Sequence, residues 1–199
     1  MTSPFRIARA WLGLSLLAAS ASLPAAAAGP ESEQAAGRLR LGWASADITP
    51  DRSVVIAGGS AARISQGVSN QIYATALAIE ATRDNGPSDM VIMVSLDLVG
   101  VTGILYSRVQ ERVSKAAPEI DTDKIILNAT HTHTAPDQGT APDLVKMHAQ
   151  HGIDVPVAWA KWGIDLGVMP AEEYIVFAAE RIAAAVGQAW KARKPGGIS

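Results

Sequence analysis

The chain has 199 residues and a formal net charge of −2, with 17 basic residues, 19 acidic residues and no cysteine. Without cysteine there are no disulfides and no thiolate metal sites, so a metal ion would have to be held by His, Asp, Glu or Tyr. No basic stripe runs along the sequence, and we therefore expect no nucleic-acid partner.

The first 28 residues have the pattern of a signal peptide. Two arginines precede an apolar stretch, Ala10–Leu23, and the alanines Ala25–Ala28 supply an A-x-A-type cleavage site. A retained membrane anchor is the alternative, but the stretch is rich in Ala and Ser and shorter than a bilayer span requires. We expect a secreted or periplasmic protein without stable membrane insertion. Residues 29–38 are polar and small and are expected to form a flexible leader.

Two strands and a turn are predicted in the first half of the remaining chain. The first strand is Leu39–Ile48. A Gly- and Ser-rich loop follows over Ala57–Ser69, in which the glycines are free to adopt positive φ. The segment Ile72–Thr82 alternates as a half-buried strand does, and Arg83–Pro87 has strong turn chemistry.

A strand, a helix and a second strand come next. Met90–Leu98 is almost continuously apolar, as expected of a strand covered on both faces. Gly103–Ala117 has apolar residues at helical spacing, and Ile125–Ala129 is a second buried strand. This order predicts a buried parallel β-α-β crossover. The expected fold class is α/β, and a mixed α+β fold remains open.

The last third of the chain combines a mixed segment with a long helix. Gln138–Met169 contains Gly, Pro and two Trp residues, and it fits a substrate-facing lid as well as a packed insertion. Ala171–Arg193 has a long amphipathic pattern that predicts a helix, ended by Pro195–Gly197.

The main candidate site is the His-Thr-His run that follows the second buried strand. In an extended strand the side-chain period is two, so His131 and His133 would project from the same face. Paired imidazoles at a strand end suit a metal ion or a polarised substrate group. The alternative is a structural role, with hydrogen bonds to the neighbouring Thr hydroxyls.

Two carboxylates are further candidates. Asp97 ends the strand before the helix and is expected at the same sheet edge as His131, which it would orient as a second-shell carboxylate. Equally, Asp97 would cap the loop at Val99–Gly100. Asp137 fits a third metal ligand, although a turn after Pro136 is the more ordinary role.

Four segments together resemble the neutral/alkaline non-lysosomal ceramidase family. Gly42–Pro50 (GWASADITP) resembles the opening of that family, and Ile72–Leu77 (IYATAL) resembles its L-Y-A-R-A strand. Val94–Asp97 (VSLD) and Ile126–Pro136 (ILNATHTHTAP) resemble its V-S-x-D strand end and its T-H-T-H block. The matches occur in family order between roughly residues 40 and 137.

The resemblance implies roles for both histidines. In the family the first His of the T-H-T-H block is a zinc ligand, which implies that role for His131. The second His contacts the reacting substrate, which implies a catalytic role for His133. The other family ligands, a His, a Glu and a Tyr, come from further along the chain and have no counterpart here. Residues 39–199 would then be the N-terminal portion of a larger catalytic domain, inactive alone.

The resulting hypothesis is an exported zinc-dependent hydrolase of ceramidase type. Its substrate would be N-acyl sphingosine or a related lipid amide, cleaved by zinc-activated water. One alternative is a ceramidase-like hydrolase that acts on a non-ceramide substrate, and another is an unrelated metal hydrolase that uses H-x-H in a different fold. A third is a non-catalytic or vestigial exported domain. Zinc affinity separates the last from a complete site. The sequence gives no indication of oligomeric state.

Overall fold

A computed structural model describes residues 38–59, 63–83, 86–139, 150, 152 and 167–197. These residues belong to one compact unit, which spans Ala35–Ser199. The predicted signal peptide, the leader up to residue 37 and most of the 138–169 segment lie outside the described residues.

The described residues form the strands and helices that the sequence predicts, together with four short elements that it does not. In chain order the elements are β1 (Arg38–Asp47), β2 (Val55–Ile56), β3 (Arg63–Ile64), β4 (Tyr73–Arg83), β5 (Gly86–Leu96), α1 (Gly103–Ala116), the 3-10 helix η1 (Thr122–Lys124), β6 (Ile125–Ala129), α4 (Ala171–Lys191) and β7 (Lys194–Gly196).

Five of these strands form one sheet in the order β6-β5-β4-β1-β7, while β2 pairs with β3. The strand β4 is antiparallel to β1 and β5, and β7 is antiparallel to β1. Only β5 and β6 are parallel, joined by a connection that contains α1. The predicted crossover is confirmed. Because antiparallel pairs predominate, the fold is mixed α+β, the second of the two fold classes that the sequence left open.

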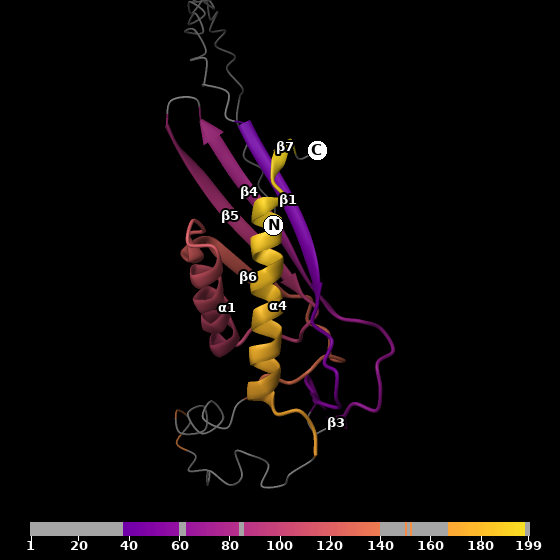
Figure 1. The fold of residues 1–199 in the computed structure, drawn as a ribbon. Coiled ribbons are helices and arrows are strands. Elements are labelled where there is room, and N and C mark those ends of the chain that lie inside the picture. Colours follow the sequence, from indigo (N-terminus) through magenta and orange to yellow (C-terminus); the bar gives the residue numbers. More distant parts are fainter. Residues whose placement is uncertain are drawn as a thin grey trace, which may run out of the picture. The chain divides into compact units, whose positions relative to one another are not determined.

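Helices α1 and α4 lie side by side against one face of the sheet (Figure 1). The strand residues beneath them are fully buried, with small side chains on β4 and larger ones on β5: Ala74, Ala76, Ala78, Ile92, Val94 and Leu96. Alanines also line the buried side of α4: Ala178, Ala179, Ala183, Ala185 and Ala189. Small residues on both surfaces let the helix approach the sheet closely, which buries the core between them.

Gly42 of β1 marks the closest approach between α4 and the sheet. A Cβ atom on this residue would lie 2.2 Å from the carbonyl oxygen of Ala189 and 2.7 Å from the backbone nitrogen of Arg193. Backbone atoms cannot swing aside as a flexible side chain can, so only glycine fits between strand and helix.

The outer face of the sheet carries an exposed apolar row. Trp43, Leu77, Met93 and Ile126 stand opposite one another on β1, β4, β5 and β6, and their exposed fractions are 69%, 36%, 44% and 49%. The prediction that Met90–Leu98 is covered on both faces is therefore wrong for the described residues. Its continuous apolar sequence instead reflects one face in the core and a second apolar face that is exposed.

The unpredicted strands are too short to leave a pattern in the sequence. Strands of two or three residues show no period-2 alternation, so β2, β3 and β7 cannot be recognised from hydrophobicity. β7 forms where Pro195–Gly197 was expected only to end the helix. Helix α4 does stop at Lys191, and the chain then pairs with Leu39–Leu41 of β1.

A buried hydroxyl ties the start of α4 to the end of β1. The Tyr174 hydroxyl donates a hydrogen bond to the carbonyl oxygen of Ile48 at 3.1 Å. Burial raises the pKa of Tyr174, so this phenol stays protonated and remains a donor. Within the part of the chain that the structure describes, we find no helix long and apolar enough to span a membrane.

Gly42→Ala is expected to lower the free energy of unfolding by about 1–3 kcal/mol, because the added methyl group forces β1 and α4 apart. Gly187→Ala is the matched control. A Cβ atom at Gly187 in α4 meets nothing within 4 Å, so better helix propensity should raise stability by roughly 0.5–1 kcal/mol. Urea unfolding followed by circular dichroism measures both. A neutral Gly42→Ala would contradict the close packing of strand and helix.

Candidate functional site

The candidate site lies beyond the carboxyl ends of the two parallel strands. The backbone pairing of β5 and β6 continues into the loops that follow them. Thr130 N donates to Leu96 O at 2.9 Å, and Thr132 N donates to Leu98 O at 3.2 Å. These bonds fix the backbone on both sides of His131, at the sheet edge where the sequence placed it.

His131 has a left-handed backbone, with φ of 64°. This conformation is uncommon for any residue other than glycine. Its Nδ1 lies 2.6 Å from the carbonyl oxygen of Val99. A carbonyl oxygen only accepts hydrogen bonds, so Nδ1 carries the proton and donates it. In a neutral ring the lone pair is then on Nε2, the atom that faces His133.

The imidazole of His133, two residues further along the loop, lies against that of His131. The two Nε2 atoms are 3.4 Å apart, and the rings meet edge to face with centroids 5.0 Å apart. Both side chains are exposed. The premise of an extended strand through both residues is wrong, because β6 ends at Ala129. The left-handed turn at His131, rather than a two-residue period, brings the imidazoles together.

The Thr hydroxyls have partners other than the imidazoles. Thr132 Oγ1 and Thr134 Oγ1 share a hydrogen bond of 2.9 Å, and Thr130 Oγ1 donates to Asp97 Oδ1 at 3.5 Å. The structural alternative for the His pair relied on imidazole–hydroxyl bonds, and the bonds described for these three hydroxyls go elsewhere. The two Nε2 atoms instead face each other.

Asp97 lies at the same sheet edge as His131, as expected. Its Oδ2 accepts a hydrogen bond from Tyr73 N at 2.9 Å, and its Oδ1 is the acceptor for Thr130 Oγ1. The partner of the His131 ring is instead the carbonyl of Val99. Asp97 therefore holds the backbone of β4 and the hydroxyl of the residue before His131, and a direct orienting role stays a prediction.

Asp137 has the geometry of a turn. Its Oδ1 accepts from Gly139 N at 3.2 Å, and its backbone nitrogen donates to Val55 O at 2.8 Å. Among the described residues, no group of three His, Asp or Glu side chains is arranged to hold a metal ion. The structure thus brings together His131 and His133, with Asp97 behind them.

Sequence reasoning missed two residues that contact His133. A Cβ atom on Gly58 would lie 2.5 Å from both Cγ and Nδ1 of His133, so the imidazole lies directly on the Gly58 backbone. Arg63 Nη2 donates to the carbonyl oxygens of Ala57 at 2.9 Å and His133 at 2.8 Å. The Gly58-Gly59 pair was a signal for unusual backbone conformation, but nothing in the sequence links it to His133.

Sequence reasoning also missed Gln138, a buried side chain that braces the loops around the site. Its Nε2 donates to Gly100 O at 2.9 Å, and its Oε1 accepts from Thr102 Oγ1 at 3.3 Å. Thr102 is also the N-cap of α1, where its Oγ1 accepts from Leu105 N. Gln138 therefore connects the loop after the His pair to the start of the crossover helix.

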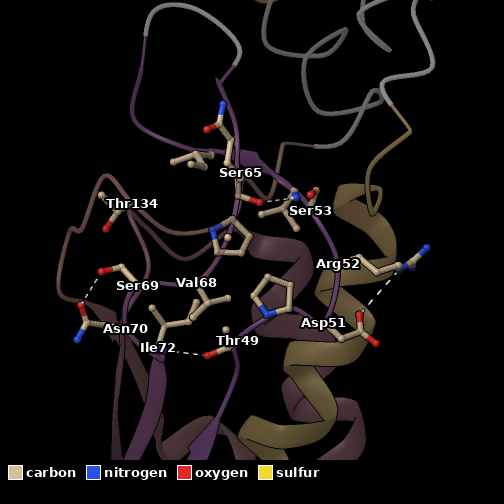
Figure 2. Close-up of a pocket in the computed structure, with 16 residues that line it drawn as sticks. Thr49, Asp51, Arg52, Ser53, Ser65, Val68, Ser69, Asn70, Ile72 and Thr134 are labelled. Carbon is tan, nitrogen blue, oxygen red and sulfur yellow. Dashed lines mark hydrogen bonds and ion pairs between the residues drawn. The ribbon is translucent and has the colours of Figure 1, made fainter.

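A pocket of about 580 Å³ opens beside the loop that carries the histidines (Figure 2). Thr134 and Pro136 form part of its wall, and the rest comes from the segment before β2, from Ile56 of β2 and from the segment after β3. Two hydrogen bonds hold the wall: Ile72 N donates to Thr49 Oγ1, and Val54 N donates to Ser65 Oγ, both at 2.9 Å. The lining mixes hydroxyl and aliphatic groups, which suits a ligand with polar and apolar parts.

The arrangement defines a class of fold: a mixed sheet covered by helices on one face, with a His-x-His pair beyond its parallel strands. Among solved structures, this fold is similar to neutral ceramidase from Pseudomonas aeruginosa, with a TM-score of 0.60 and 20% identity over 81% of this chain. A structure titled as ceramidase complexed with C2 matches with a TM-score of 0.58 and 20% identity, also over 81% of this chain.

The likeness covers only part of those proteins. The chain spans 23% of the first neighbour and 22% of the second. No family model matches the sequence, and no curated protein matches it significantly. At 20% identity, the likeness to the two structures shows that this chain has a ceramidase-like fold.

Proposed function

We propose that this chain forms part of an exported zinc hydrolase that cleaves a lipid amide such as N-acyl sphingosine. The observation that supports it most is the His131–His133 pair, whose Nε2 atoms face each other at 3.4 Å on a fold similar to neutral ceramidase. Export through the 1–28 signal peptide belongs to the same proposal.

His131 fits a zinc ligand. Imidazoles that bind metal ions generally donate their second ring N–H to a carbonyl or carboxylate, which sets the tautomer and the ring orientation. The Nδ1 bond to Val99 O does this for His131. Its Nε2 is then the ring nitrogen that would bind zinc.

His133 fits the group that contacts the reacting carbonyl. Because the facing Nε2 of His131 has the lone pair, a hydrogen bond between the rings requires His133 Nε2 to be the donor. When His131 binds a cation instead, that N–H is released towards the site. An N–H donor placed there stabilises negative charge that develops on a substrate oxygen, and an imidazole can also transfer a proton to a leaving amine.

Zinc supplies Lewis-acid polarisation of the amide carbonyl and activation of the attacking water. A catalytic zinc ion generally takes three protein ligands, and His131 is the imidazole proposed to bind it, since His133 keeps its N–H for the substrate. At least two more ligands would therefore come from outside the described residues.

The lipid amide is proposed from the names of the two neighbours, which are ceramidases. The pocket beside the His loop supports a substrate of mixed polarity, since its wall contains hydroxyls next to Val54, Val68 and Ile72. Arg52, on the same wall, is paired with Asp51 and Glu173, so the structure provides no reason to expect an anionic substrate.

Zinc binding by the chain tests the metal half of the proposal. His131→Ala is expected to weaken Zn²⁺ binding at least ~10-fold, because the ring that Val99 holds in place is the ligand. Glu119→Gln, which changes an exposed carboxylate beyond the far end of α1, should leave the affinity unchanged. Titration against a chelating dye measures both variants. Equal affinity for wild type and His131→Ala would remove zinc from the proposal.

Hydrolysis by the natural protein, purified from its source at its natural length, tests the other half. With zinc bound it should release fatty acid from a short-chain N-acyl sphingosine. His133→Ala is expected to lower kcat by ~100-fold or more, as loss of an acid–base or oxyanion group does. Ser107→Ala, an exposed change on α1, is the control. Zinc-loaded natural protein that cleaves no lipid amide would overturn the proposal.

A further inference from the structure

The imidazole of His133 rests on a position that only glycine can fill. Gly58 has φ of +80°, and a Cβ atom there would lie 2.5 Å from Cγ and Nδ1 of His133 and 3.0 Å from its Cβ. Heavy atoms do not approach so closely, so any side chain at this position would have to push the ring away. The strained φ adds a second reason for glycine.

One guanidinium nitrogen fastens the two segments that meet here. Arg63 Nη2 donates to Ala57 O, the carbonyl just before Gly58, and to His133 O. A single donor atom thus bridges the backbone under the ring and the backbone that carries the ring. Bonds from a charged donor are stronger than neutral ones, and the planar guanidinium fixes their directions.

Strand pairing limits the remaining freedom. Ala57 N donates to Ala135 O at 2.9 Å, and Asp137 N donates to Val55 O at 2.8 Å, so the segment before Gly58 runs alongside the segment after His133. Arg63 lies opposite Ile56 in the β2–β3 pair. The loop with His133 therefore has two attachments: the β5–β6 extension on one side and this small hairpin on the other.

We propose that Gly58 and Arg63 are positioning residues for His133, which hold its imidazole against His131. Because Gly58 has no side chain, the His133 ring can lie against the β2–β3 hairpin. Arg63 bonds the His133 backbone to this hairpin and so fixes its position. The importance of this clamp for hydrolysis rests on the proposed function, but the clamp itself is a statement about where the ring lies.

Gly58→Ala tests the first half of the clamp, with Gly67→Ala as its control. Gly67 lies in the loop after β3, where a Cβ atom meets nothing within 4 Å. In wild type, NMR should show a nuclear Overhauser effect between the imidazole protons of His131 and His133. Gly58→Ala should abolish it and shift the His133 ring signals, while Gly67→Ala should leave both unchanged. A folded Gly58→Ala protein with the wild-type effect would overturn the proposal.

Variants of Arg63 test the other half of the clamp, and they do not place a side chain at a positive-φ position as Gly58→Ala does. Arg63 is exposed, so Arg63→Met should fold while losing both bonds to carbonyl oxygens. We expect a weaker Overhauser effect between the imidazoles and shifted His133 ring signals, because the His133 backbone loses its bond to the guanidinium. Arg63→Lys should recover part of each, and Arg83→Met, at the opposite end of β4, should change neither.

The two readouts separate the clamp from the hydrolase. If wild type binds no zinc but shows the imidazole contact, and Gly58→Ala loses it, the proposed function fails and the clamp stands. If zinc binds and amides are cleaved while Gly58→Ala and Arg63→Met keep the imidazole contact, the function stands and the clamp is wrong.

Discussion

The site depends on the parallel pairing of β5 with β6, because the same ladder continues past both strand ends. Bonds from Thr130 N to Leu96 O and from Thr132 N to Leu98 O hold the backbone on either side of His131. These bonds offset the cost of the left-handed backbone at His131, since such strain persists where the surroundings hold it. A one-residue slip of the pairing would move His131 away from the Val99 carbonyl that holds its ring.

The two faces of the sheet follow different rules. The inner face is set by small residues, since Gly42 and the β4 alanines let α4 approach the strands. The outer face is apolar in its middle, with Trp43 and Met93 exposed, and becomes polar towards the site, where Ser45 and Thr75 share a hydrogen bond of 2.8 Å. The apolar region is thus separate from the site edge, and the exposed row is a surface suited to contact with another apolar layer.

Much of the fold follows from the sequence, and the geometry of the site does not. Long periodic segments such as Ala171–Lys191 are recognisable because burial repeats along them. The exposed outer face of Met90–Leu98 was not predicted, because an apolar run has the same sequence pattern whether its second face is covered or not. The His pair was found from residue type, but its geometry depends on Gly58 and Arg63, distant in the chain, and on a carbonyl, which every residue has.

That carbonyl accounts for the different roles proposed for two identical side chains. Val99 O can only accept, so it keeps the proton of His131 on Nδ1 and directs a lone pair at His133. No equivalent acceptor is described for His133, whose ring rests on the Gly58 backbone. The His131 ring consequently presents the lone pair of Nε2, and the His133 ring can present an N–H. A ligand for a cation and a partner for an oxyanion need this division, and it arises from backbone placement rather than from the residue types.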